Sequence, residues 1–176
     1  MVSYFMDDVR ALNGVSFGFD MCKQASPCMH KYLSLEGSTT YFFEKLSNAR
    51  VDVEVLRQRL VSDSSGRVLQ RSSRLFIVQR ERIIVVANSQ VYIDRIDSKY
   101  REALLACDQG IGKILDPFNT GCLQKRDLGF EYVESPQELN TLSTWALCRR
   151  FELLFDGSVC ASIEETVCNL SLARAL

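Results

Sequence analysis

Two adjacent acidic residues, Glu164 and Glu165, interrupt the apolar segment ASIEETV near the end of the chain. In a β-strand, residues two positions apart share a face. Glu165 therefore shares its face with Ile163 and Val167, whereas Glu164 shares its face with a serine and a threonine. A carboxylate that faces an apolar interior needs a partner or a ligand. Glu165 is thus the stronger candidate for chemistry, unless the strand lies at a wet sheet edge, where Glu165 is only solvated.

Two arginines, Arg71 and Arg74, occupy a second strand-like segment, GRVLQRSSRLFIV. A guanidinium inside a protein suits a ligand carboxylate, because its planar fork donates to both carboxylate oxygens. The simpler alternative is that each arginine lies on a wet face and pairs across the sheet. Taken with the acidic pair, the pattern predicts a small, dry pocket with one arginine, one acid and no metal ion.

The stretch QGIG, residues 109–112, follows a segment that is typical of a helix. A phosphate-binding loop places its glycines after a strand and before a helix, and it ends in Gly-Lys followed by Ser or Thr. Here Lys113 is followed by Ile114, which disfavours nucleotide binding. We predict instead that Gly110 ends the preceding helix, and that backbone amides freed by these small residues face a neighbouring site.

The charge of the chain is almost balanced, with a net charge of −1 and a pI of about 5.9. This balance disfavours nucleic acid as a partner, since such binding relies on neutralising phosphates with lysine and arginine. No apolar run approaches the ~20 residues of a membrane span. The first residues carry acids where a signal peptide carries bases. We therefore expect a cytoplasmic protein without a membrane span.

Seven cysteines and one histidine, His30, supply the thiol and imidazole groups of the chain. An odd number of cysteines cannot pair completely within one chain. A structural zinc site normally draws on closely spaced ligand pairs, and no Cys-x-x-Cys occurs. The pattern predicts reduced, mostly buried thiols, in keeping with a cytosolic location.

Strand-like and helix-like segments follow one another in groups. One helix precedes three strands and a second helix precedes three more, the last two joined by Asp156-Gly157, a pair that favours a tight hairpin. The sequence therefore predicts an α+β fold with an antiparallel six-stranded sheet and helices packed on one side. We expect one domain, residues 1–176, in which residues 1–30 form a less defined N-terminal arm. The predicted helices are 37–48 and 97–110, and the predicted strands are 49–61, 67–78, 83–93, 123–133, 144–155 and 159–167.

Over residues 31–168 the chain resembles the chorismate pyruvate-lyase family through the order and spacing of several segments. They are the lead into the first helix, YLSLEGSTTYFFEKL; the central hairpin, GRVLQR with VVANSQVYIDRI; the second helix and its glycine turn, LLACDQGIGKIL; and the last hairpin, CRRFELLFDGSVCASIEETV. The resemblance implies a chorismate lyase-like fold. It also implies a cofactor-free enzyme that eliminates pyruvate from chorismate and leaves 4-hydroxybenzoate, a precursor of quinones and other phenolic compounds.

The resemblance implies roles for named residues at the substrate carboxylate. Arg71, in its LQR context, matches the family arginine that grips the carboxylate, and Arg74 takes its place if the hairpin is three residues shorter. The backbone N–H groups of Thr39 and Ile111 match the two amides that hold the same carboxylate. The Ile111 side chain would cover the ring.

At the other end of the substrate, Glu165 matches the family acid that meets the ring hydroxyl, or Glu164 does if the last strand shifts by one residue. Aromatisation makes the reaction strongly downhill, so the enzyme mainly positions the substrate and stabilises charge. Glu165 would assist proton transfer if burial raises its pKa. Ser89 and Gly110 stand where some members carry a basic residue and a proline, and both departures bear on turnover rather than on the fold.

Two other functions are compatible with the same resemblance. The fold also serves as the effector-binding half of some bacterial transcription regulators, so a non-catalytic domain that senses a small aromatic acid is the main alternative. No helix-turn-helix is recognised before residue 31, which disfavours a complete regulator. The second of these other functions is that of an inactive relative of the lyase, which binds the ligand without turning it over. In every case the expected partner is a small molecule, chorismate or its aromatic product, and the chain is expected to be a monomer or a homodimer.

Overall fold

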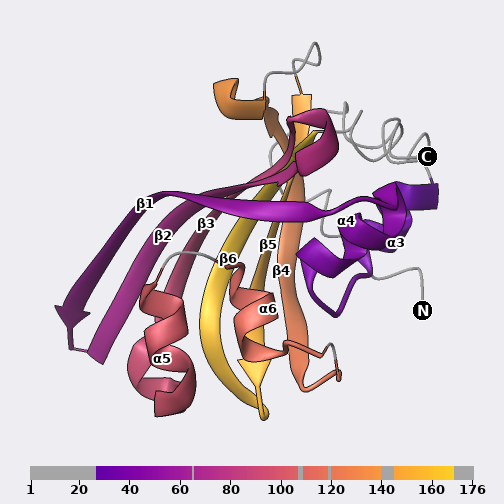
Figure 1. The fold of residues 1–176 in the computed structure, drawn as a ribbon. Coiled ribbons are helices and arrows are strands. Elements are labelled where there is room, and N and C mark those ends of the chain that lie inside the picture. The colour runs from indigo at the N-terminus through magenta and orange to yellow at the C-terminus, as the bar shows by residue number, and fades with distance from the viewer. Residues whose placement is uncertain (1–26, 65, 107–108, 119, 140–144, 169–176) are drawn as a thin grey trace.

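The chain folds into one antiparallel sheet whose inner face is covered by helices (Figure 1). The computed structural model describes residues 27–64, 66–106, 109–118, 120–139 and 145–168. The sheet has six strands in the order β1-β2-β3-β6-β5-β4, and all neighbours are antiparallel. This confirms the predicted α+β fold. The strands are β1 (Val51–Asp63), β2 (Gly66–Ile77), β3 (Arg82–Tyr92), β4 (Leu123–Glu134), β5 (Trp145–Phe155) and β6 (Ser158–Cys168).

The last strand of the chain, β6, lies in the middle of the sheet between β3 and β5. Its Glu165 lies opposite Ala87 of β3 and Arg149 of β5. The hairpin that leads into β6 turns at Asp156 and Gly157, whose φ angles are 49° and 76°. Positive φ at both central residues matches the twist of the strands, and Asp-Gly adopts it readily, which is why the sequence signal for this hairpin was reliable.

The helices are α3 (Pro27–Leu33), α4 (Thr39–Ser47), α5 (Ser98–Leu105) and α6 (Ile111–Leu115). Asn48 ends α4 in the left-handed conformation, with φ of 48°. Asp97 caps α5 by accepting a hydrogen bond from the Lys99 N–H at 3.1 Å. Both ends agree with the sequence prediction. The prediction for the N-terminal arm ran to residue 30, and the structure places a helix, α3, across that limit; residues 1–26 lie outside the described residues.

The expected role of Gly110 as the end of a helix is wrong. The preceding helix, α5, ends at Leu105, and Gly110 lies at the N-cap position of α6 with φ of −67°. The conformation is one that any residue adopts, so a left-handed turn is not the reason for a glycine here. The reason lies in its close packing against α4.

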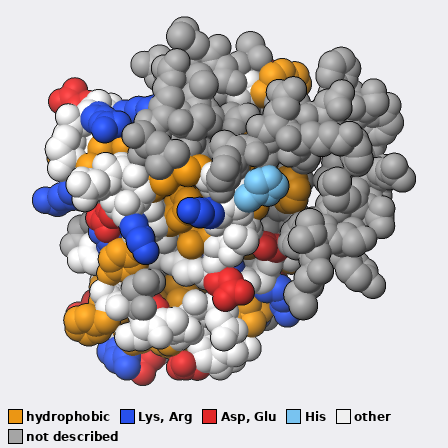
Figure 2. All heavy atoms as spheres, turned by 90° about the vertical axis from the view of Figure 1, so that its right-hand side faces the viewer, with side chains coloured by type: hydrophobic (Ala, Val, Ile, Leu, Met, Phe, Trp, Pro, Cys, Tyr) orange, Lys and Arg blue, Asp and Glu red, His pale blue; other side chains and the backbone are white. Residues whose placement is uncertain are grey.

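Two apolar clusters join the helices to the inner face of the sheet. One contains Phe43 of α4 with Leu147 of β5, and the other contains Leu104 of α5 with Phe151 of β5. Burying such side chains contributes roughly 1.5–3 kcal/mol each. On the side of the molecule where α3 and α4 lie, charged and apolar side chains are interspersed on the surface (Figure 2). No helix among the described segments has the length and apolar character that crossing a membrane requires.

Candidate functional site

A cavity of about 60 Å³ lies between the inner face of the sheet and the first residues of α4 and α6. Thr39, Arg71, Ile111 and Glu165, four residues singled out in the sequence, all line it, although each comes from a different element. Apolar side chains complete the wall, among them Leu123, Phe151, Leu153 and Ile163. Ordinary ligand pockets begin near 300 Å³.

The two glycines of QGIG allow α6 to start directly against α4. A Cβ added to Gly112 would lie 3.0 Å from Oγ of Ser38, and one added to Gly110 would lie 3.2 Å from Oγ1 of Thr40. Real Cβ atoms rarely approach other atoms so closely. The stretch lines the cavity, and its small residues permit the close approach of two helix starts. That its backbone amides face a ligand stays a prediction.

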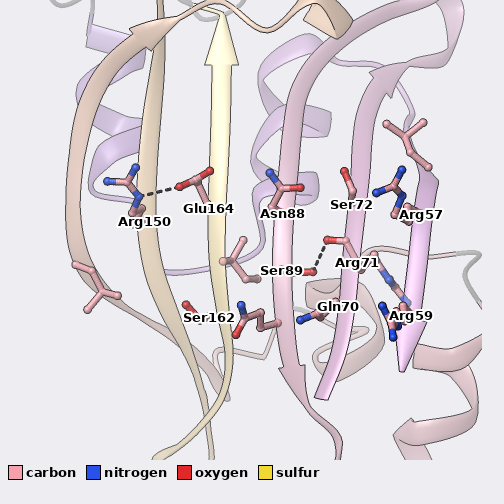
Figure 3. Close-up of a pocket in the computed structure, with 14 residues that line it drawn as sticks. Arg57, Arg59, Gln70, Arg71, Ser72, Asn88, Ser89, Arg150, Ser162 and Glu164 are labelled. Carbon is pink, nitrogen blue, oxygen red and sulfur yellow. Dashed lines mark hydrogen bonds and ion pairs between the residues drawn. The ribbon is translucent and has the colours of Figure 1, made fainter. Parts of the chain in front are cut away.

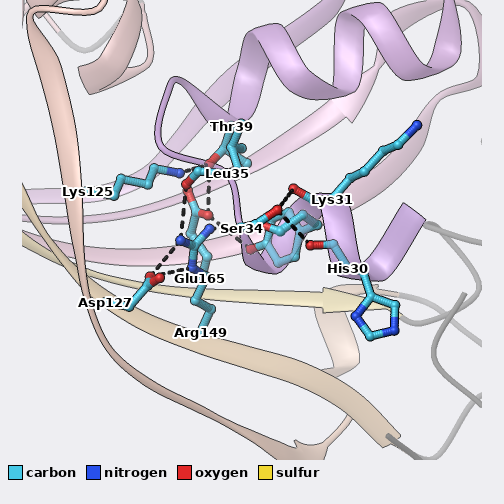
Figure 4. Close-up of polar contacts among 10 residues, drawn as sticks. His30, Lys31, Ser34, Leu35, Thr39, Lys125, Asp127, Arg149 and Glu165 are labelled. Atoms are coloured by element: carbon cyan, nitrogen blue, oxygen red, sulfur yellow. Dashed lines mark hydrogen bonds and ion pairs between the residues drawn. The ribbon is translucent and has the colours of Figure 1, made fainter. Parts of the chain in front are cut away.

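Glu165 is 6% exposed and points into the cavity side of the sheet (Figure 4). Its Oε2 accepts hydrogen bonds from the Thr39 hydroxyl at 2.9 Å and from the Tyr32 hydroxyl at 3.0 Å. Burial is the main cause that raises the pKa of Tyr32 well above its usual range, and the charge of Glu165 adds to it. Tyr32 therefore remains a neutral donor to the carboxylate at all ordinary pH values.

Lys125 is the residue that sequence reasoning missed at this site. Its ammonium donates to Oγ1 of Thr39 at 2.7 Å and lies 4.3 Å from the centre of the Phe151 ring. Burial lowers the pKa of Lys125 to about 8, an effect that Arg149 strengthens and that Glu165 and Asp127 oppose. The sequence signal was weak, because Lys125 shares its strand face with the apolar Leu123 but also with the charged Asp127.

Arg149 is a buried cation beside this site that the sequence reasoning also missed. It is 2% exposed, pairs with Oδ1 of Asp127 at 2.6 Å and donates to the backbone oxygens of Tyr32 at 2.8 Å and Leu35 at 3.1 Å (Figure 4). These bonds tie α3 and the chain that follows it to β5. Arg149 thereby positions Tyr32 over Glu165.

Arg71 is 3% exposed, which agrees with a position beside the cavity. Its guanidinium, however, forms hydrogen bonds with other groups of the protein. Its Nε donates to Oε1 of Gln58 at 2.7 Å, Nη1 donates to the Gln109 carbonyl at 3.0 Å, and Nη2 donates to the Leu104 carbonyl. Arg71 therefore fastens the end of α5 and the glycine stretch to β1 and β2. The alternative candidate, Arg74, lies on the outer face and pairs with Glu54 at 2.7 Å.

Glu164, the alternative acid, also lies on the outer face, where it pairs with Arg150 at 2.8 Å (Figure 3). A larger hollow of about 840 Å³ covers this part of the outer face. Arg150 is shared between Glu164 and Glu131, so these charges are already compensated. The hollow is an open sheet face lined by both polar and apolar side chains. The smaller cavity, which holds buried charges among apolar side chains, is the better candidate for a functional site.

Among the residues that the structure describes, no cysteine lines this cavity. Cys28, Cys122, Cys148 and Cys160 are free thiols in the structure. In the described part of the chain, no three His, Cys, Asp or Glu side chains gather as a metal site would require.

Comparison with known proteins yields structural likenesses alone. No family model and no curated protein matches the chain. It is similar to the gene product SA0254 from Staphylococcus aureus subsp. aureus N315, with a TM-score of 0.48, 14% identity and coverage of 69% of this chain and 85% of that one. It is similar to a GntR-family transcriptional regulator from Bacillus cereus, with a TM-score of 0.44, 12% identity and coverage of 66% and 90%. It is also similar to the effector-binding domain of the B. subtilis trehalose repressor, with a TM-score of 0.44, 9% identity and coverage of 66% and 89%. Function therefore has to be inferred from the side chains that line the cavity.

Proposed function

We propose that this domain binds a small organic acid in the cavity between the sheet and the starts of α4 and α6. The observation that carries the proposal is the set of ionisable side chains Arg71, Lys125 and Glu165 around one small cavity with apolar walls. Burying charge is costly, and groups of this kind gather where a protein handles a polar ligand. Two of the three are cations, which favours an anionic ligand.

The ligand carboxylate would lie near Thr39, where the first N–H groups of α4 have no partner within the helix. Ser38, the N-cap residue, makes no side-chain hydrogen bond to them. The ammonium of Lys125 lies beside the same threonine, at 2.7 Å from its hydroxyl. An aromatic acid would place its ring against Phe151 and Ile111. Because the cavity is only about 60 Å³, a ring requires α6 or the Lys125 side chain to move outward.

Binding without turnover is the function that the arrangement of Arg71 favours. The lyase mechanism implied by the family resemblance uses this arginine to grip a carboxylate through its planar fork. Here Nε, Nη1 and Nη2 donate to Gln58, Gln109 and Leu104. A ligand would have to displace these bonds to gain a bidentate contact. A sensor or receptor for a small acid, aromatic or aliphatic, needs no such exchange.

Chorismate lyase activity is the second candidate, and one observation favours it. Thr39, Arg71, Ile111 and Glu165, the residues to which the resemblance assigns the reaction, line the same cavity. In that case Glu165 would meet the ring hydroxyl and take part in proton transfer, and Arg71 would turn from α5 to the substrate carboxylate. The reaction would yield pyruvate and 4-hydroxybenzoate without a metal or organic cofactor.

A thermal unfolding experiment tests the binding proposal. Titration with 4-hydroxybenzoate, with acetate and with phenol, which lacks the carboxylate, should raise Tm for one or both acids but not for phenol. A ligand at about a hundred times its Kd stabilises the folded state by roughly 2.7 kcal/mol. If neither acid nor any other small carboxylate raises Tm, the proposal fails. Incubation with chorismate, followed by an assay for released pyruvate, separates the lyase from the receptor.

A further inference from the structure

An amine, a hydroxyl and a carboxylate form one hydrogen-bonded row beside the cavity (Figure 4). Lys125 Nζ donates to Thr39 Oγ1 at 2.7 Å, and the Thr39 hydroxyl donates to Glu165 Oε2 at 2.9 Å. Tyr32 donates to the same carboxylate oxygen at 3.0 Å. An amine in contact with a group that accepts its proton, and with a third group behind it, has the general arrangement of an activated nucleophile.

We infer that Lys125 binds a small 2-oxo acid covalently, as a reversible imine between its side-chain nitrogen and the keto carbon. This inference rests on the proposed function, because it uses the same cavity and the same preference for an acid. It goes beyond that function in naming a covalent attachment point and a class of ligand, of which pyruvate is the simplest member.

The surroundings of Lys125 favour the neutral amine that such a reaction needs. Its ammonium faces the Phe151 ring at 4.3 Å, and it has no carboxylate within ion-pair distance among the described residues. With a pKa of about 8, about one lysine in ten is neutral at pH 7, whereas an ordinary lysine near 10.4 is neutral about once in a few thousand. The charged groups that act on its pKa are Glu165 and Asp127, which favour the ammonium, and Arg149, which opposes it.

The reaction balances with water as its second product. The nitrogen lone pair of the neutral amine forms a bond to the keto carbon, and the carbonyl electron pair moves to oxygen. One of the two amine protons passes through the Thr39 hydroxyl and Glu165 to this oxygen, which gives a carbinolamine. The second amine proton follows the same route to the hydroxyl, which leaves as water with the C–O electron pair while the nitrogen lone pair forms the C=N bond. No oxidant, reductant or cofactor takes part.

Cavity size and charge select the ligand class. A volume of about 60 Å³ suits an acid of few atoms better than a substituted ring. Arg71 also lines the cavity, and although its N–H groups bond to the protein, its positive charge favours a carbonyl compound that carries a carboxylate over a neutral aldehyde of equal size. Glu165 lies on the amine side of the cavity, where it serves proton transfer rather than binding of the carboxylate.

Reductive trapping tests the inference on the wild-type protein. The full chain is incubated with pyruvate and sodium cyanoborohydride, and its intact mass is measured. We expect the mass to rise by one pyruvate less one oxygen atom, and peptide mapping to place the adduct on Lys125. Lys125→Arg should lose the adduct, whereas Lys113→Arg, which replaces a lysine paired with Glu44, should keep it. No adduct, or adducts spread over exposed lysines, overturns the inference.

Competition keeps the test independent of whether a variant folds. An excess of whichever acid raises Tm, 4-hydroxybenzoate or acetate, should suppress labelling of Lys125 in the wild-type protein, since neither acid has a keto group. If 4-hydroxybenzoate raises Tm but pyruvate gives no adduct at Lys125, the imine is excluded and the proposed binding function stands. If no small acid raises Tm and no adduct forms, both are excluded. Labelling of Lys125 that the competitor leaves unchanged would show that the amine reacts outside the proposed site, which overturns the inference.

Discussion

The hydroxyl of Thr39 donates a hydrogen bond to the carboxylate of Glu165 at 2.9 Å, although the two residues are 126 positions apart. This bond joins the first turn of α4 to the central strand β6. The same hydroxyl accepts the bond from Lys125, so Thr39 is the link between the acid and the base of the site.

Replacing Thr39 by valine should destabilise the protein by about 1–3 kcal/mol, the usual cost of leaving a buried polar group without its partner. Valine keeps the shape of the side chain but removes both hydrogen bonds at once. Thr39→Ser keeps the hydroxyl and should lose much less. The free energy of unfolding in urea measures both. Equal loss in the two variants would mean that the methyl group, and not the hydroxyl, stabilises this position.

Glu165→Gln should abolish any release of pyruvate from chorismate, and it should also lower the pKa of Lys125 below about 8, because the carboxylate charge favours the ammonium. Glu164→Gln is the matched control, since its carboxylate pairs with Arg150 on the outer face. The pKa is measured from the nitrogen-15 shift of the Lys125 side chain. An unchanged pKa in Glu165→Gln, or a larger change in Glu164→Gln, would contradict the arrangement.

The stability of the protein should depend on pH through Lys125. Its folded pKa of about 8 lies below its usual 10.5, so between these values the unfolded chain binds the additional proton. Stability from this residue therefore rises as pH increases from about 8 towards 10.5, and it is at its lowest and constant below the folded pKa. The measurement is the difference in unfolding free energy between wild type and Lys125→Met from pH 6 to pH 10, since other groups titrate in both. A difference that does not change with pH would show that the Lys125 pKa is not lowered.

Arg71→Ala should cost several times more stability than Arg74→Ala. Arg71 is buried and bonds to Gln58 and to the carbonyls that follow α5, and these groups would lose their donors. Arg74 belongs to a partly exposed pair with Glu54, a type that contributes about 0–1 kcal/mol. Chemical denaturation of the two variants provides the comparison. If both lose equally little, Arg71 does not anchor α5.

Gly112→Ala should destabilise the contact between α4 and α6, because the added Cβ would meet Ser38 Oγ at 3.0 Å and Ser38 Cβ at 3.2 Å. Alanine is otherwise favoured over glycine in a helix by roughly 0.5–1 kcal/mol, so a loss of stability isolates the steric effect. In a double-mutant cycle, Ser38→Gly should restore part of the loss by removing the opposing side chain. Independent, additive effects would show that the two positions do not press on one another.

The strands and the fold class were predictable because their signals are local. Alternation in β1 and β6, and the Asp156-Gly157 turn, depend on neighbouring residues, and the structure confirms them. The helix start at Ile111 was not predictable in this way. Its glycine serves a contact with Ser38 and Thr40, some 70 positions away, which no local pattern contains.

The sequence predicted the acid of the cavity, Glu165, but it did not predict the base, Lys125. Glu165 has an apolar face partner on each side, so its direction followed from alternation alone. Lys125 lies in a strand with charged residues on both faces, LQKRD, where alternation does not separate inside from outside. The direction of its side chain depends on the pairing of β4 with β5 and on the contact with Thr39 of α4, and the local sequence contains neither. The sequence predicted that Arg71 faces the interior, and it does. Its hydrogen bonds to the carbonyls of residues 104 and 109 depend on the path of the chain after α5, which no local pattern shows.

The place of β6 between β3 and β5 has a consequence for biosynthesis. During translation β1 to β3 and β4 to β5 leave the ribosome first, and each group has an open edge until β6 arrives. Such edges are templates for unwanted pairing. The strand that closes them also brings Glu165 to Thr39, so the same event completes the sheet and the site. A nascent chain that lacks β6 therefore lacks the cavity, because Ile163 and Glu165 of this strand line it. A ligand can bind in the cavity only after β6 has been synthesised.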